Sequence, residues 1–145
     1  MKTFRIHNNL IFCVFAAVAL ISVAAASSLG GAERLRHAGN FTRYKYADDL
    51  YDADRYGEAR DIYAGLIGEY PVSYAVVYKT ALCEFYLDNY DDAITYGLKA
   101  LELLPILTDD EDFLTFMEIS FAEVGDGVNA GIMAEKRRYV QQKKA

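Results

Sequence analysis

The apolar and polar positions of this chain repeat after 34 residues across its central part. The stretch from Arg55 to Pro71 recurs, with substitutions, from Asn89 to Pro105. The matching pairs all keep this offset: Tyr56 and Tyr90, Ala59 and Ala93, Pro71 and Pro105, and upstream Tyr44 and Tyr78, Lys45 and Lys79, Ala47 and Ala81, and Asp54 and Asp88. A period of this length is typical of two helices joined by a turn. The pattern therefore predicts an all-α fold that contains two helical hairpins.

The small and acidic positions of the repeat predict how each hairpin is built. Two antiparallel helices approach closely only where small side chains meet. This predicts two pairs of facing alanines, Ala47 with Ala59 and Ala81 with Ala93. Asp54 and Asp88 come just before the second helix of each hairpin, where a carboxylate can cap free backbone amides and oppose the helix dipole. A proline then ends each repeat, because it cannot continue a helix.

After Pro105 the pattern weakens but stays helical. The run from Thr108 to Glu111 has the sequence of a capping box and predicts the start of an amphipathic helix. The glycines around Asp126 break that helix, and a last apolar-periodic stretch follows them. We expect residues 108–145 to form a degenerate third hairpin that caps the array, since the end of a helical repeat protein needs a polar outer surface.

The repeated positions resemble those of the tetratricopeptide repeat family. The residues that carry the resemblance are the small Ala47 and Ala81, the pairs Tyr56/Tyr90 and Ala59/Ala93, and the closing prolines Pro71 and Pro105. The resemblance implies a short α-α superhelix with repeats at about 40–73, 74–107 and 108–145. Two positions depart from the family pattern: Glu84 replaces a large aromatic residue, and Gly97 replaces a large residue, for which Tyr96 is expected to compensate.

The N-terminus carries a separate apolar block. Lys2 and Arg5 precede an almost uninterrupted apolar run from Leu10 to Ala26, and Ala24 and Ala26 stand where a signal peptidase would cleave. This arrangement is typical of a secretory signal peptide. The run is also long enough to remain as an uncleaved membrane anchor. We therefore expect residues 1–26 to be a signal peptide or an N-terminal anchor helix, residues 27–39 a linker, residues 40–145 the helical domain, and the protein to be exported.

Composition and charge exclude several classes of function. Hydrophobic residues make up 53% of the chain and charged residues 25%, which indicates a globular protein. The net charge of −6 and the acidic centre argue against nucleic acid as a partner. The two histidines, His7 and His37, both precede the helical domain, so we expect no metal centre and no catalytic dyad in it. Cys83 is the one cysteine after the leader, and we expect it to pack as a small apolar residue.

Tyrosine is the most informative residue type of the helical domain. All 12 tyrosines follow residue 43, and several fall on the first helix of a hairpin, the helix that lines the concave groove in tetratricopeptide repeats. The resemblance implies ten groove residues: Tyr44, Lys45, Asp48, Tyr51, Asp52, Tyr78, Lys79, Leu82, Phe85 and Tyr86. Some family members clamp a peptide's terminal carboxylate with lysine and asparagine, but Asp48 stands where that clamp requires asparagine.

These observations predict a non-enzymatic protein-interaction module, an adaptor or assembly factor without a cofactor. Tyrosine provides a large contact area and little rotamer freedom to lose, which suits a binding surface. An acidic, tyrosine-lined groove favours a protein or peptide segment with apolar and basic side chains. Two alternatives stay open. One is a carrier or sensor of small ligands that uses the same groove, and the other is a structural subunit that forms a homodimer. Membrane contact is expected only through the N-terminal segment.

Overall fold

Helices account for nearly all of the chain that this computed structural model describes, which is residues 38–69 and 73–144. The first helix is described over residues 38–52. It is followed by α2 (Tyr56–Ile67), α3 (Tyr74–Tyr86), α4 (Tyr90–Leu103), the 3-10 helix η1 (Pro105–Asp109), α5 (Glu111–Glu123) and α6 (Gly127–Lys144). The prediction of an all-α fold is thus confirmed for these residues. The predicted signal or anchor helix lies outside them.

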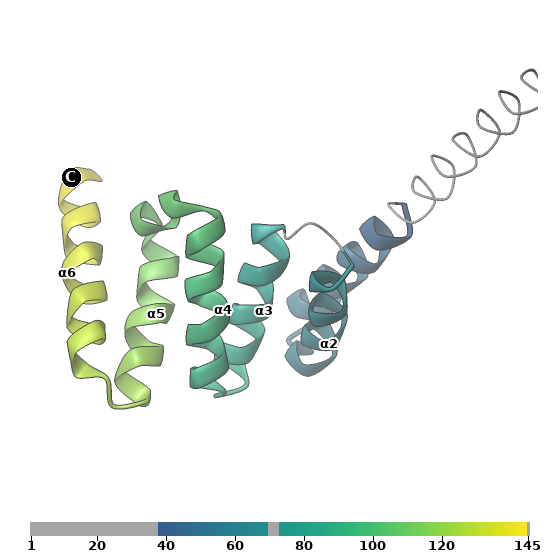
Figure 1. Ribbon diagram of the computed structural model, residues 1–145, viewed down its shortest axis with the longest axis horizontal. Coiled ribbons are helices and arrows are strands. Elements are labelled where there is room, and N and C mark those ends of the chain that lie inside the picture. Colours follow the sequence, from purple (N-terminus) through teal and green to yellow (C-terminus); the bar gives the residue numbers. More distant parts are fainter. Residues whose placement is uncertain (1–37, 70–72, 145) are drawn as a thin grey trace, which may run out of the picture. The chain divides into compact units, whose positions relative to one another are not determined.

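The chain divides into two units, Met1–Phe41 and Thr42–Ala145, and all elements from α2 to α6 belong to the second. Within it each helix packs mainly on its neighbours in the chain, as antiparallel pairs. Figure 1 shows α3, α4, α5 and α6 side by side in this order, from teal to yellow. The arrangement is compatible with helical hairpin repeats. No helix among the described residues is both long and apolar enough to cross a membrane.

Two clusters of buried side chains form the core of this unit. The smaller cluster surrounds Tyr63 of α2, which is fully buried together with Ala47, Ala59 and Cys83. The larger cluster lies between α3, α4, α5 and α6 and is centred on the α5 side chains Phe113, Leu114, Phe116, Met117 and Phe121. The four alanines that the repeat predicts at helix contacts, Ala47, Ala59, Ala81 and Ala93, all have an exposed fraction of 0%. Small side chains therefore occupy fully buried positions at the places the repeat specifies.

Gly97 on α4 packs directly against side chains of α5. A Cβ atom added there would lie 2.4 Å from the sulfur of Met117 and 3.1 Å from a ring carbon of Phe116. Two heavy atoms never pack at the first distance, so any larger residue would force the side chain of Met117 to move. The family pattern has a large residue at this position. Here Met117 and Phe116 from the next helix fill the space beside Gly97, and Tyr96 packs, partly buried, against the same core cluster.

Glu84, the other departure from the family pattern, is a buried carboxylate between helices. Only 5% of the residue is exposed. One carboxylate oxygen accepts a hydrogen bond of 2.8 Å from the side-chain amide of Asn89, and the other lies 3.7 Å from a guanidinium nitrogen of Arg60 on α2. Since a buried charge is tolerated only when it is paired, these contacts explain how an acidic residue replaces an aromatic one.

The turns that close the helices at Asp54, Asp88 and Gly125 share one geometry. All three residues have positive φ angles, of 58°, 60° and 80°. In each turn the following amide donates a hydrogen bond of 2.8–2.9 Å to the carbonyl five residues back, the Schellman arrangement that ends a helix. The prediction that Asp54 and Asp88 cap the next helix is therefore wrong. Their carboxylates instead accept hydrogen bonds from the hydroxyls of Tyr56 and Tyr90, two residues further on.

The start of α5 also differs from the predicted capping box. Asp110, and not Thr108, is the N-cap, and its carboxylate accepts a hydrogen bond of 2.8 Å from the amide of Phe113. The Thr108 hydroxyl donates to the Pro105 carbonyl inside η1. The capping box failed because Pro105 starts a short 3-10 helix, which delays α5 by two residues.

Replacing Gly97 by alanine tests the close contact between α4 and α5. We expect Gly97→Ala to lower the free energy of unfolding by about 1–3 kcal/mol, because Met117 must move to accept the new methyl group. Gly131 in α6 is the matched control, since a Cβ there would meet no atom within 4 Å. Gly131→Ala should raise stability by about 0.5–1 kcal/mol, as alanine does in an open helical position. Urea unfolding measures the free energy of unfolding of both variants. Equal changes in the two variants would contradict the close contact between Gly97 and Met117.

Candidate binding groove

Two adjoining pockets are lined by residues of α3 together with Tyr44 and Tyr51 of the first helix and residues of η1 and α5. The first, here called the aromatic pocket, has a volume of about 420 Å³ and is lined chiefly by Tyr51, Leu82, Phe85, Tyr86, Phe116 and Ile119. The second, the η1 pocket, has a volume of about 530 Å³ and is lined chiefly by Tyr44, Tyr74, Ile106, Leu107, Asp109 and Asp110. Tyr78 lines both pockets. Together they form one open groove that runs along α3.

The groove contains most of the residues that the sequence places there. Seven of the ten expected residues line one pocket or the other: Tyr44, Tyr51, Tyr78, Lys79, Leu82, Phe85 and Tyr86. Asp48 lines neither pocket but contacts Lys79, which does. Lys45 and Asp52 are exposed on the first helix and line neither pocket. The structure thus brings the aromatic members together in the two pockets and leaves three of the four charged ones outside them.

Aromatic rings contact one another along the floor and walls of the aromatic pocket. The ring of Tyr86 stacks on that of Tyr56 with centroids 4.5 Å apart, and Tyr51 meets both rings edge-on at 6.0 and 5.3 Å. Phe116 from α5 lies 6.0 Å from Phe85 and 5.9 Å from Tyr78. Each such pair contributes about 0.5–1.5 kcal/mol beyond burial of its area. The rings are therefore held in place before any partner arrives, which reduces the entropy cost of binding.

Asp48 organises the charged part of the same face. One of its carboxylate oxygens accepts a hydrogen bond of 2.5 Å from the hydroxyl of buried Tyr63, and the Nζ atom of Lys79 lies 3.4 Å from this oxygen. The same ammonium stands 4.2 Å above the ring of Tyr51, a cation–π contact. Lys79 is therefore already paired inside the protein. A carboxylate of a partner would therefore have to compete with Asp48 for this lysine.

Sequence reasoning missed the contributions of α2, η1 and α5 to the groove. Tyr56 supports the pocket from α2, and Tyr74 lines the η1 pocket at the start of α3. Phe116 and Ile119 form the α5 wall. The sequence shows the helical pattern of α5. However, the 34-residue offset fades after Pro105, so the repeat gives no register that would assign α5 residues to the groove. The structure therefore extends the groove across a third helix.

Neither a metal-binding cluster nor an ionised thiol is found among the described residues. Among residues 38–69 and 73–144, no group of three or more His, Cys, Asp or Glu side chains is placed to hold a metal ion. Cys83 has an exposed fraction of 0%, and burial raises the pKa of its thiol to about 12, so it stays protonated at neutral pH. His7 and His37 lie outside the described residues.

Comparison with known proteins adds no assignment for this chain. No protein-family model matches it, and no curated protein is significantly similar to it. The case for a function therefore depends on the groove itself.

Three groove and core tyrosines have strongly perturbed ionisation. Burial is the main cause that raises the pKa of Tyr51, Tyr63 and Tyr78 above the ordinary value of 10.0. The hydrogen bond to Asp48 adds to this for Tyr63, and the charges of Asp110 and Asp112 add to it for Tyr78. The unfolded chain loses these protons near pH 10 while the folded protein keeps them. Their contribution to stability is thus complete below pH 10 and declines as the pH rises further.

We predict an alkaline unfolding transition from these tyrosines. The free energy of unfolding, measured with urea at pH 8 to 11.5, should fall steeply above about pH 10. Absorbance at 295 nm should show that the buried tyrosines ionise together with the loss of helical circular dichroism. The free energy of unfolding of the Tyr63→Phe variant should fall less steeply with pH, because this variant lacks one of the tyrosines whose pKa is raised. Ionisation of all tyrosines near pH 10 with the helices intact would contradict the burial of these rings.

Proposed function

We propose that residues 40–145 form a tetratricopeptide-like interaction module that binds a segment of another protein in the groove along α3. It acts as an adaptor or assembly factor and not as an enzyme. The observation that carries this proposal is the groove itself: rings from three helices form two adjoining pockets and are fixed by mutual contacts. Recognition surfaces for peptides commonly combine such aromatic anchors with a polar rim.

The shape of the groove favours a peptide over a small ligand. Both pockets are open depressions that adjoin through Tyr78, and neither is an enclosed cavity. A small-ligand site typically buries most of its ligand in a closed cleft. A run of side chains from an extended or helical segment fills two adjoining depressions more completely. The proposal also places the module outside the cytoplasm, on the strength of the apolar leader at residues 10–26.

The local geometry supports the tetratricopeptide-like assignment without a family match. The turns at Asp54 and Asp88 are 34 residues apart and have nearly the same φ, and each is followed by a tyrosine that bonds back to the aspartate. Equivalent sequence positions thus adopt equivalent backbone and side-chain conformations. This recurrence is what a tandem helical hairpin requires.

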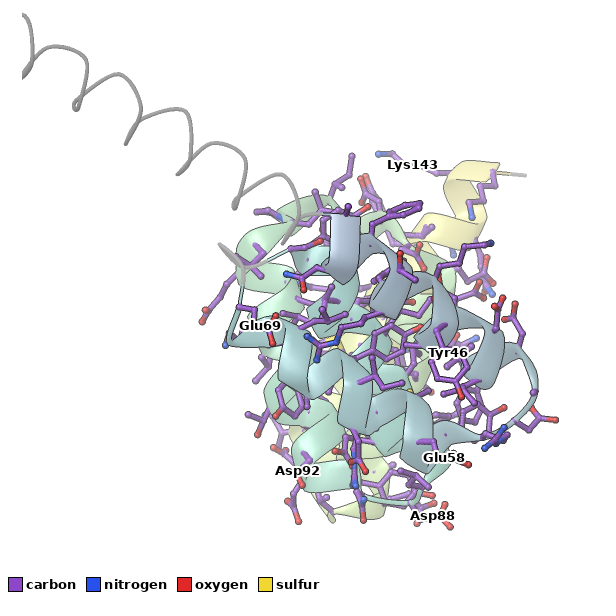
Figure 2. The ribbon with its side chains drawn as sticks, turned by 90° about the vertical axis from the view of Figure 1, so that its right-hand side faces the viewer. Tyr46, Glu58, Glu69, Asp88, Asp92 and Lys143 are labelled. Atoms are coloured by element: carbon purple, nitrogen blue, oxygen red, sulfur yellow. The ribbon has the colours of Figure 1, made fainter. Side chains whose placement is uncertain are left out.

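A comparison of two pairs of tyrosine variants tests the function. Tyr74 and Tyr86 belong to the groove, with 43% and 49% of each residue exposed. Tyr46 and Tyr139 are exposed to 54% and 59% and line neither groove pocket. Figure 2 shows Tyr46 on the side of the molecule that faces the viewer, at the end of the helix row. Both pairs remove the same chemical groups, so they are matched.

We expect the tagged full-length chain to capture specific proteins from an extract of the source cells. The double variant Tyr74→Ala/Tyr86→Ala should reduce their yield at least tenfold, which corresponds to about 1.4 kcal/mol of binding energy. Tyr46→Ala/Tyr139→Ala should capture them like the unaltered chain. Quantitative mass spectrometry measures the yields, and circular dichroism confirms that both variants are folded. Equal yields from the two variants would refute the groove as the binding site.

A further inference from the structure

The η1 pocket combines aromatic walls with uncompensated negative charge. The rings of Tyr44, Tyr74 and Tyr78 line it, and Asp109 and Asp110 lie at its η1 end. The Asp109 carboxylate has no hydrogen-bond or ion-pair partner among the described residues. One oxygen of Asp110 caps α5, which leaves the other available.

The one cation that lines this pocket is already neutralised. Lys79 lies at its border, but its ammonium is paired with Asp48 and covers the ring of Tyr51. The pocket therefore has a net negative charge, and it is lined by tyrosine rings, whose electron-rich faces attract cations. The long stem of an arginine or lysine side chain packs well along such rings while its charged end meets a carboxylate.

The aromatic pocket suits a different side chain. Its walls are Tyr51, Leu82, Phe85, Phe116 and Ile119, with Asp112 and Thr115 at the rim. A large apolar or aromatic side chain would bury most of its surface against these residues.

The spacing of the two pockets limits how one partner can fill both. The α3 residues of the η1 pocket span 74–79, and those of the aromatic pocket span 78–86. The midpoints of these ranges are about five to six residues apart, which corresponds to roughly 8–9 Å along a helix. Positions i and i+3 of a polyproline II segment lie on one side about 9 Å apart.

We propose, on the basis of the function proposed above, that the groove selects a peptide segment with an arginine or lysine three positions away from a large apolar residue. The basic side chain occupies the η1 pocket and is held by Asp109 and the rings of Tyr74 and Tyr78. The apolar side chain occupies the aromatic pocket. Charge complementarity and pocket spacing together define this occupant.

A display library of random 12-residue peptides tests the specificity on the full-length chain. Enriched peptides should share a lysine or arginine three positions from Phe, Tyr, Trp, Leu or Ile. The Asp109→Asn substitution should lower the affinity for a representative peptide at least tenfold, as measured in a titration by fluorescence anisotropy. The matched control is Asp91→Asn on α4, which removes the same charge from a residue that lines neither groove pocket and should change the affinity less than twofold.

A neutral version of the same peptide completes the cycle. Replacing the basic residue of the peptide by glutamine should lower its affinity for the unaltered protein at least tenfold. The same replacement should lower the affinity for the Asp109→Asn variant less than threefold, because this variant has already lost the charge contact. Enriched peptides without a basic residue, or equal losses with Asp91→Asn and Asp109→Asn, would overturn the inference.

The same experiment separates this inference from the proposed function. One outcome would be enriched peptides that lack a basic residue, bind the unaltered protein and fail to bind the Tyr74→Ala/Tyr86→Ala variant. This outcome would refute only the proposed specificity for a basic residue. Peptides that bind this variant normally, or the absence of any enriched peptide, would refute the groove and the inference together.

Discussion

The close contact of successive helices at small residues is the constraint on which the rest of this structure depends. Ala59, Ala81 and Ala93 are fully buried, and Gly97 leaves room for Met117 of the next helix. Because each helix sits tightly against its neighbours in the chain, alternate helices come to share one face. That face is where the helix over 38–52, α3 and α5 place their rings. The groove is therefore a consequence of helix packing and does not need a dedicated binding loop.

The residues of the groove also contribute to the packing of the fold. Tyr51, Tyr56 and Tyr86 contact one another across three helices, and Asp48 joins the buried hydroxyl of Tyr63 to the ammonium of Lys79. Partial burial of these rings fixes their positions, and partial exposure leaves their outer surfaces for a partner. Such preorganisation lowers the cost of ordering side chains on binding. In α6, Met133 and Val140 are buried, while Val128, Ile132 and Tyr139 are exposed.

The sequence predicted the repeated helices but not the contacts that join residues of different helices. Seven of the ten residues that the family resemblance implied line one of the two pockets. The 34-residue offset predicted the helices of residues 40–105, because helix periodicity and buried small residues are local properties. It mistook Asp54 and Asp88 for helix caps, because a residue before a helix and one in a left-handed turn look alike in sequence. It did not find the contacts of Glu84 with Asn89 and Arg60 or of Gly97 with Met117, which join different helices. The α5 wall was missed because the offset fades after Pro105.

Hydrogen–deuterium exchange of the full-length chain, with and without a peptide enriched on it, tests the central claim most directly. The claim is that one face, shared by three alternate helices, receives the partner. Binding should slow exchange in residues 44–51, 74–86 and 105–119 and leave α4 and α6 unchanged. Protection confined to α4 or α6, or to only one of the three groove helices, would contradict this account.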